Sequence, residues 1–379
     1  MHKRTLALTL ALVAGCGLSH IEALSGTPPA DAAPPDVGTP DAGTLDAASL
    51  DADAPDAAPL DVGLPDASSA GGHWEPTLDA ISCYGHTATL LPDGGVLLVG
   101  QCSLNGEAVA ALRYDVSGRG GRAAILAEPR IFHGAVALEG GEVMIVAGVR
   151  AETDQPLRST EIFDLATGTF RAGPLLGHPR GAPGVLRDGA RVIVAGGSVG
   201  DFEGPMTSVE LIDLRDGSVS ELAPLTTPRS GTILAKRGDV ILAIGGQTRR
   251  HENGTVEALG AGVIEVLPSW CWDPRASANS LDVICDGQLL ELSSGVRVGP
   301  RLLFSHMRPA MARLADGSVL VLGSSPWTSD PPAFPERIFG DVSSPVPSPE
   351  HPYLWPTATL LPDGNVLVVG ESISQVYVP

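Results

Sequence analysis

One short phrase occurs at two distant places in this chain. Residues 87–100 read TATLLPDGGVLLVG and residues 357–370 read TATLLPDGNVLVVG, and twelve of the fourteen positions agree. Weaker copies lie between them, at residues 133–148, 181–197, 230–246 and 308–323. The glycines that end the six copies, at positions 100, 148, 197, 246, 323 and 370, are separated by 48, 49, 49, 77 and 47 residues. Self-similarity with a period in this range predicts a repeat architecture.

Each copy predicts a β-hairpin. An alternating strand meets a turn such as residues 91–94, LPDG, where Pro presets φ and Gly accepts a positive φ. The return strand, residues 96–99 in the first copy, is apolar on both faces and therefore has to be covered on both sides. A weaker phrase predicts third and fourth strands after most hairpins, at residues 111–118, 159–175, 207–225, 262–270 and 289–302.

The hairpin phrase and the phrase after it resemble kelch repeats and the propeller domain of galactose oxidase. The resemblance covers residues 73–379 and implies an all-β fold, a kelch-like β-propeller. The 307 residues of this region correspond to between six and seven units of about 48 residues. The longest step, between Gly246 and Gly323, contains residues 283–300, which lack a full return strand. We interpret this stretch as a degenerate blade, which predicts seven blades; six blades and an insertion is the alternative.

The two ends of the repeat region predict how the ring closes. Residues 71–77 match the fourth-strand phrase and residues 373–379 match the third-strand phrase, so neither end completes a sheet alone. We expect the two strands to pair within the last blade and to place Trp74 near Val376. Such closure removes the exposed sheet edges that favour aggregation.

The first sixteen residues predict export and a lipid anchor. Residues 1–15 have a basic start and an apolar run at 6–13 that is too short to span a bilayer, as in a signal peptide. Residues 13–16, VAGC, resemble the lipobox of bacterial lipoproteins, which implies cleavage before Cys16 and lipidation of its thiol. Gly17 implies, by the same resemblance, an outer-membrane lipoprotein that faces the periplasm or the cell surface, with the lipid as its membrane contact. An ordinary signal peptide with an incidental cysteine is the alternative.

A Pro-, Ala- and Asp-rich segment, residues 16–72, separates the lipobox from the repeats. Aspartates recur every five residues from Asp31 to Asp66, a period that fits neither a helix face nor a strand face. Such a segment buries too little apolar area to offset the entropy of ordering, so we expect a disordered linker.

Four cysteines remain once Cys16 is assigned to lipid. Cys83 and Cys102 lie symmetrically about the first hairpin turn, and Cys271 and Cys285 bracket the degenerate blade. We expect two disulfides, Cys83–Cys102 and Cys271–Cys285, which suits an oxidising compartment. Zinc binding is the less favoured alternative, since neither spacing is C-x2-C.

We find no catalytic, cofactor-binding or metal-binding constellation. Nucleophile elbow, P-loop and zincin motifs are all missing from the sequence. The resemblance to galactose oxidase implies a copper site of two tyrosines and two histidines, which Tyr84, Tyr114, Tyr353 and Tyr377 do not match.

Several repeated polar residues have two readings. His86 and His133 share one repeat position, and His178 and His306 are expected to share another. These histidines could converge on the ring axis as metal ligands, but we favour a role in packing. Repeated arginines before the hairpins are also expected to be structural: Arg130, Arg180, Arg229 and Arg308.

Charge and aromatic residues define the expected partners. The net charge of −20 and the lack of a Lys/Arg cluster argue against nucleic acid. Trp327 and Trp355 are the aromatic residues least constrained by the repeat, and we expect them to contact a ligand. The favoured hypothesis is a monomeric envelope module, without a cofactor, that binds a protein or a polysaccharide. The alternatives are a carbohydrate-active enzyme, galactose oxidase-like or lyase-like, that uses the axial cleft, and a structural envelope protein.

Overall fold

The computed structural model describes residues 71–123, 125–200, 204–248, 254–267, 275–276, 281–285, 288–304, 306, 309–323, 334–349 and 353–379. All of them belong to one compact unit, residues 62–379. The predicted signal peptide, Cys16, nearly all of the linker, Cys271, Arg308 and Trp327 lie outside the described residues.

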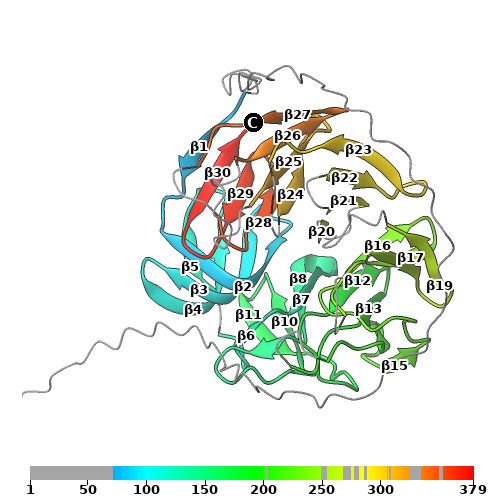
Figure 1. Ribbon diagram of the computed structural model, residues 1–379. Helices are drawn as coiled ribbons and strands as arrows, with labels where there is room; N and C mark the ends of the chain where they lie inside the picture. Colours follow the sequence, from blue (N-terminus) through cyan, green and yellow to red (C-terminus); the bar gives the residue numbers. More distant parts are fainter. Residues whose placement is uncertain are drawn as a thin grey trace, which may run out of the picture. The chain divides into compact units, whose positions relative to one another are not determined.

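The described residues form seven four-stranded antiparallel sheets around a common axis (Figure 1). Blade 1 contains β2 (Ile81–Leu90), β3 (Val96–Leu104), β4 (Glu107–Tyr114) and β5 (Gly120–Arg122). Blade 2 contains β7 (Gly134–Ala137), β8 (Glu142–Val146), β10 (Thr160–Asp164) and β11 (Thr169–Ala172). Blade 3 contains β12 (Gly184–Asp188), β13 (Arg191–Ala195), β14 (Val209–Asp213) and β15 (Val219–Leu222). Blade 4 contains β16 (Ile233–Arg237), β17 (Val240–Ile244), β18 (Thr255–Ala258) and β19 (Gly262–Val266).

The remaining blades complete the ring. Blade 5 contains β20 (Arg275–Ala276), β21 (Asp282–Cys285), β22 (Gln288–Glu291) and β23 (Arg297–Arg301). Blade 6 contains β24 (Ala310–Arg313), β25 (Val319–Leu322), β26 (Glu336–Phe339) and β27 (Val342–Pro345). Blade 7 contains β28 (Thr357–Leu360), β29 (Val366–Val369), β30 (Ser374–Val378) and β1 (His73–Pro76). Seven blades are confirmed and the six-blade alternative is wrong, because the degenerate stretch forms a complete sheet whose inner strand has two residues.

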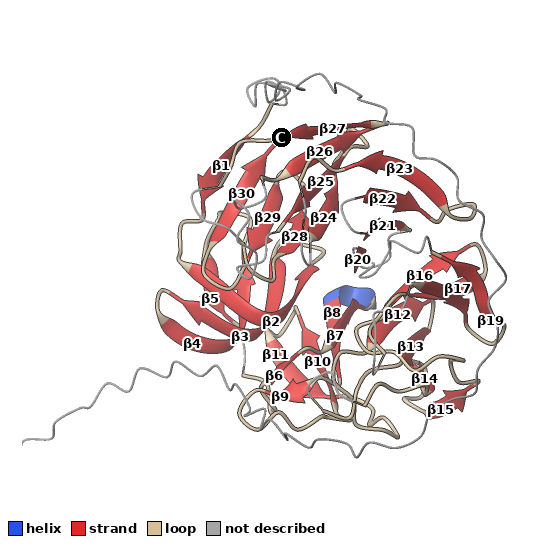
Figure 2. Cartoon of the chain, viewed as in Figure 1, coloured by secondary structure: helices blue, strands red, loops and turns tan. Residues whose placement is uncertain are grey.

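Strands account for most of the described secondary structure (Figure 2). A 3₁₀ turn, η2 (Glu139–Gly141), replaces the β-turn in the first hairpin of blade 2, and β6 (Arg130–Ile131) pairs with β9 (Val149–Arg150) in a short separate ladder. Within the described ranges, no helix combines the length and apolar character needed to cross a bilayer.

The apolar second strands explain why the blades stack. All four residues of β25 and of β29 are buried, as are the first five of β3. Seven hydrophobic clusters cover them, and each joins residues of two neighbouring blades, including blades 7 and 1. The core of this protein therefore lies between the sheets, as a strand that is apolar on both faces requires.

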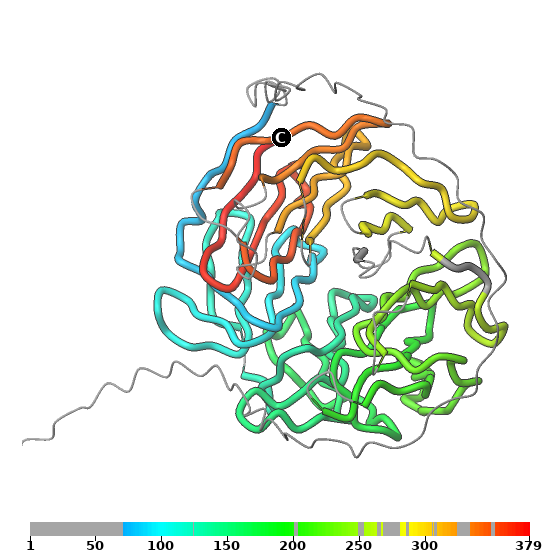
Figure 3. The backbone as a smooth tube through the Cα atoms, in the orientation of Figure 1, coloured from blue at the N-terminus to red at the C-terminus, as the bar shows by residue number. Residues whose placement is uncertain are grey.

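The predicted closure is confirmed. β1, the outermost strand of blade 7, pairs with β30, placing Trp74 opposite Tyr377 and Glu75 opposite Val376. The tube drawing shows the blue N-terminal strand beside the red C-terminal one (Figure 3). Trp74 stabilises this closure of blade 7. Its indole nitrogen donates to the carbonyl of Pro347 at 2.6 Å, and its ring lies 5.1 Å from that of Tyr377.

Candidate functional site at the axial mouth

The inner strands start at one mouth of the ring, and the backbone there repeats an uncommon conformation. Residues at one repeat position, just before or within the inner strand, have a left-handed backbone, with φ of 55° at Gly85, 50° at Phe132, 45° at Ala182, 66° at Gly231 and 49° at Trp355. For the three that are not glycine, this conformation costs roughly 1–2 kcal/mol each. Strain of this kind is often found at ligand clamps.

Hydrogen bonds between blades hold this conformation. The amide of Phe132 donates to the carbonyl of Gly85 at 2.8 Å, that of Ala182 to Phe132 at 2.7 Å, and that of Gly231 to Ala182 at 2.8 Å. The left-handed residue thus links each of blades 1 to 3 to the next. Satisfying these buried backbone groups offsets the conformational cost.

These residues surround a hollow of about 380 Å³. Its described lining comes from blades 1, 2, 3, 4, 6 and 7, so the hollow lies on the axis, and it includes no Asp, Glu, Lys or Arg. We call this cavity the axial hollow. Its lining includes His86, Phe132, His133, Thr232 and Trp355.

Three aromatic rings meet at the axial hollow. The ring of Trp355 lies 6.0 Å from that of Tyr84 and 5.9 Å from that of Phe132, and Tyr84 and Phe132 are 5.4 Å apart edge to face. Trp355, which the sequence predicts to contact a ligand, lies in the lining of the axial hollow. Tyr84 and Phe132 were not predicted, although Phe132 shares the repeat position of Trp355.

Two histidines line the same hollow. The Nε2 atom of His86 is 2.9 Å from the hydroxyl of Thr357, and that of His133 is 2.8 Å from the hydroxyl of Thr87, so each ring bonds to the preceding blade. The Nδ1 atoms of both are buried and have no hydrogen-bond partner within the described part of the chain. The predicted packing role is therefore observed at Nε2, while Nδ1 remains unsatisfied.

Both imidazoles are neutral at pH 7. Burial lowers the pKa of His86 to about 4. Burial, followed by the charge of Arg130 and the proximity of His86, lowers the pKa of His133 to about 3. A neutral imidazole has one donor and one acceptor nitrogen, and in each ring the nitrogen with an observed partner is Nε2.

The predicted structural arginines bind glutamates on third strands. Arg130 bonds to Glu161 at 2.7 Å and Arg229 to Glu257 at 3.1 Å, and Arg180 bonds to Glu210; all three arginine side chains are fully buried. Each guanidinium also donates to backbone carbonyls of its own blade. These pairs belong to the scaffold and lie outside the lining of the axial hollow.

The predicted match between His178 and His306 is wrong. His178 is exposed and bonds to Glu221 at 2.9 Å. His306 is buried and lies 3.1 Å from Glu336, in the position that arginine occupies in blades 2 to 4. The reason is register: His306 precedes Pro309 by three residues, as Arg180 precedes Pro183. In blade 7, Tyr353 and Gln375 form the equivalent pair at 2.8 Å.

The Cys83–Cys102 disulfide is confirmed, and it braces an extension of blade 1. A register shift between Tyr84 and Thr87 divides β2 into two parts. In the N-terminal part, β2 pairs with the end of β3 and the two cysteines face each other; the start of β4 pairs with the same part of β3. Tyr84 is adjacent to the disulfide. Cys285 is also disulfide-bonded; its pairing with Cys271 stays a prediction.

The tyrosine–histidine copper set of galactose oxidase does not fit these residues. Only Tyr84 of the four tyrosines lies with His86 and His133, and Cys83 is engaged in a disulfide and cannot cross-link to a tyrosine. Tyr114, Tyr353 and Tyr377 are in the cores between blades. No group of three or more His, Cys, Asp or Glu residues suited to a metal occurs among the described residues.

Comparisons with known proteins identify the fold. No family profile matches the chain. No curated protein matches it in sequence. Among solved structures, a fungal alcohol oxidase of the AA5 family in complex with copper is 15% identical and aligns over 81% of this chain and 76% of its own, with a TM-score of 0.58. A streptogramin B lyase is 12% identical and aligns over 80% of this chain and 99% of its own, also with a TM-score of 0.58. The chain shares its all-β propeller fold with these two proteins.

Proposed function

We propose that this protein is a lipid-anchored envelope β-propeller that binds a neutral polysaccharide in the axial hollow. The observation that carries the proposal is the position of Trp355, which lies in a hollow whose described lining has no charged side chain and includes two neutral imidazoles. The kelch-type assignment, the lipid on Cys16 and the outer-membrane location belong to the same proposal and are supported by the residues that suggested them.

The chemistry of the lining favours a sugar over a charged ligand. A sugar ring has an apolar face that can stack on an indole and a rim of hydroxyl groups that need hydrogen-bond partners. Among the described residues, the lining has no counter-ion for a carboxylate or phosphate. Ten of the 44 acidic and two of the 24 basic residues precede residue 73, which leaves a net charge of about −12 to repel polyanions.

Rigidity of the mouth adds to this argument. The left-handed backbone at Phe132 and Trp355, the hydrogen bonds from Phe132 to Gly85 and from Ala182 to Phe132, and the contacts among the three rings order this mouth without a ligand. A site that is already ordered loses less conformational entropy on binding. This is a physical reason to maintain a strained, non-glycine residue at position 355.

A carbohydrate-active enzyme is the second candidate, favoured by the two histidines in the hollow. Efficient general bases have a pKa near the working pH. With a pKa of about 4 and about 3, His86 and His133 are weak bases, which favours a binding role at neutral pH.

The test is a binding screen of the full chain, purified in detergent, against an array of neutral and acidic glycans. We expect neutral glycans to bind, and we expect Trp355→Ala to weaken binding at least tenfold, which corresponds to about 1.4 kcal/mol. Phe339→Ala is the control, because Phe339 is 63% exposed on the outer hairpin of blade 6. Failure of every neutral glycan, or equal binding by Trp355→Ala, would refute the proposal; capture of a protein instead would favour the other partner class.

A further inference from the structure

A groove lies between blades 2 and 3, at the ends of the blades that face away from the axial mouth. Its volume is about 540 Å³, within the range of roughly 300–1,000 Å³ of small-molecule sites. The inner strand β12 starts beside the mouth residue Ala182 and ends at Asp188, and Ala190, in the turn after it, lines the groove. We call this cavity the interblade groove. Its described lining shares no residue with that of the axial hollow.

The floor of the groove is apolar. Met144 and Ile162 are opposite each other on β8 and β10 and belong to the hydrophobic cluster between blades 2 and 3. Leu138 and Leu214, one from each blade, pack against the same cluster and are only partly buried. Val143, the neighbour of Met144, belongs to the cluster between blades 1 and 2, as strand alternation requires. The floor side chains therefore face the groove.

An ion pair between the two blades closes the inner end of the groove. Arg187, on β12, bonds to Glu139, on η2, at 2.6 Å. Lys236 has the same position on β16 and bonds to Asp188 of the preceding blade at 2.5 Å. Because this contact recurs in the scaffold, we assign it to the wall of the groove and not to ligand binding.

Further charged groups on the rim of the groove are accessible. Arg171, on β11, bonds to Glu142 at 2.6 Å, and its side chain is 55% exposed. Arg215, in the turn between β14 and β15, is 70% exposed and lies 3.6 Å from Asp213, and Asp216 is exposed beside it. Ion pairs of this kind are worth at most about 1 kcal/mol. A ligand can therefore replace them at little cost.

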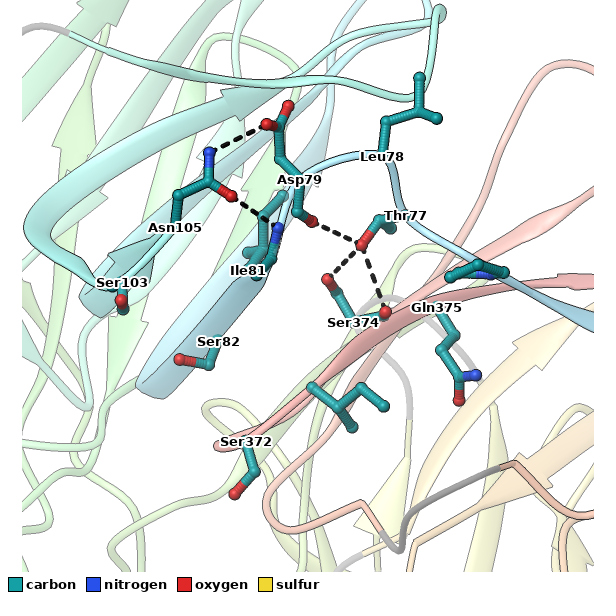
Figure 4. Close-up of a pocket in the computed structure, with 14 residues that line it drawn as sticks. Thr77, Leu78, Asp79, Ile81, Ser82, Ser103, Asn105, Ser372, Ser374 and Gln375 are labelled. Atoms are coloured by element: carbon teal, nitrogen blue, oxygen red, sulfur yellow. Dashed lines mark hydrogen bonds between the residues drawn. The ribbon is translucent and has the colours of Figure 1, made fainter.

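Another hollow, at the seam where the two ends of the ring meet, differs in this respect. Its volume is about 600 Å³, but four of its polar side chains bond to one another in pairs. The Thr77 hydroxyl lies 2.7 Å from that of Ser374, and the Asn105 amide donates to the Asp79 carboxylate at 2.9 Å (Figure 4). These bonds fasten the two ends of the ring, so we assign this hollow to the scaffold.

We propose that the interblade groove binds a short peptide segment in which an apolar residue lies between an acidic and a basic one. An apolar centre inside a polar rim that contains arginine is typical of contacts between proteins. The apolar side chain of the segment would cover Leu138 and Leu214. Its carboxylate would bond to Arg171 and Arg215, one from each wall, since guanidinium groups match carboxylates in geometry. Its basic group would bond to Asp216.

The charge of the rim favours a segment with both signs. The described lining contains three arginines and three carboxylates, so it has no net charge. A ligand with one charge of each sign matches this rim and is not repelled by the net charge of about −12 on residues 73–379. This inference does not depend on the polysaccharide proposed for the axial hollow.

The experiment measures fluorescence anisotropy of labelled peptides with the full chain, purified in detergent. The peptides have a central Leu, Ile, Val or Phe flanked by Glu and Lys in both orders, and matched peptides replace Glu or Lys by Gln, or the central residue by Ala. The groove variant is Arg171→Gln with Arg215→Gln. The matched control is Arg122→Gln with Arg297→Gln, two exposed, ion-paired arginines of blades 1 and 5.

In the wild type we expect saturable binding of at least one peptide, and loss of binding when its central residue becomes Ala. The groove variant should bind at least tenfold more weakly, and replacing Glu in the peptide should then have little further effect, because its partners are gone. The control and Trp355→Ala should bind as the wild type does. Failure of every peptide, equal binding by the groove variant, or loss of binding in Trp355→Ala would overturn the groove and leave the glycan screen to decide the axial site.

Discussion

Tyr84 and Trp355 come from the first and last blades of the ring, 271 positions apart in the sequence, and their rings lie 6.0 Å apart. The contact exists because β1 closes blade 7 and brings it against blade 1. The candidate binding site is therefore a product of closure, and changes to the seam should affect ligand binding as well as stability.

Acid should destabilise the protein through the axial histidines. An unfolded histidine has a pKa near 6.5, whereas burial lowers that of His133 to about 3, so the unfolded state binds more protons between these values. Stability is then fully present above about pH 6.5 and is lost as the pH falls toward 3. At about 1.4 kcal/mol per pKa unit, the loss from one such group reaches several kcal/mol.

Urea unfolding at pH 7 and pH 4.5 measures this effect. The difference in unfolding free energy between the two pH values should shrink in His133→Gln, since glutamine can bond to Thr87 without titrating. His73→Gln, at an exposed site on β1, should retain the full difference. An unchanged difference in His133→Gln would show that another group is responsible.

Loss of the Cys83–Cys102 disulfide should loosen the mouth. The bond spans 19 positions, and closing a loop of that size in the unfolded chain is worth roughly 3 kcal/mol. We expect Cys83→Ala with Cys102→Ala to lower the unfolding free energy by about this amount. Because Tyr84 follows Cys83, the same variant should also weaken binding of neutral glycans. A variant with a lower unfolding free energy but an unchanged affinity for neutral glycans would show that the disulfide does not support the binding site.

A buried ion pair should be costly to break from one side. Arg229 is fully buried and bonds to Glu257, so Arg229→Met leaves an uncompensated carboxylate between blades. Removing one partner of such a pair costs about 3–5 kcal/mol. Arg215→Met is the control: that side chain is 70% exposed and lies 3.6 Å from Asp213, a surface pair worth at most about 1 kcal/mol. Similar melting temperatures for the two variants would contradict the structural role assigned to the repeated arginines.

The left-handed backbone at the axial mouth predicts opposite effects of substitution at Gly231 and Ala182. Gly231 has a φ of 66° and open space where a Cβ would lie, so Gly231→Ala tests conformation with little steric contribution and should destabilise by roughly 1 kcal/mol. Ala182 has a φ of 45°, so Ala182→Gly should leave stability unchanged or raise it slightly. Thermal unfolding of both variants checks the signs; destabilisation by Ala182→Gly exceeding that by Gly231→Ala would argue against strain at this ring.

Local signals in the sequence predicted the blades. The turn at residues 91–94 and the two-sided apolar strand after it specify a buried hairpin, and its spacing specifies the repeat. The same hairpin placed Cys83 opposite Cys102, because strand pairing fixes register around a known turn. Matching the two ends to third- and fourth-strand phrases was sufficient to predict the closure of blade 7.

The site was harder to predict, because it depends on register between blades. His306 was matched with His178 when its true counterpart was Arg180, and only the position of Pro309 relative to Pro183 reveals this. The glutamates that bind the arginines were overlooked, although they follow their partners by 31, 30 and 28 residues, a spacing the sequence contains.

The position of β1 has a mechanical consequence. It is the outermost strand of its sheet and is joined to β30 by four residue pairs, so tension applied through the preceding chain would act on this narrow ladder first. Trp74, bonded to Pro347 after blade 6 and packed on Tyr353 and Tyr377, would distribute that force into the neighbouring sheet. In a pulling experiment with force applied at residue 72, we therefore expect the β1–β30 ladder to rupture before any single blade unfolds.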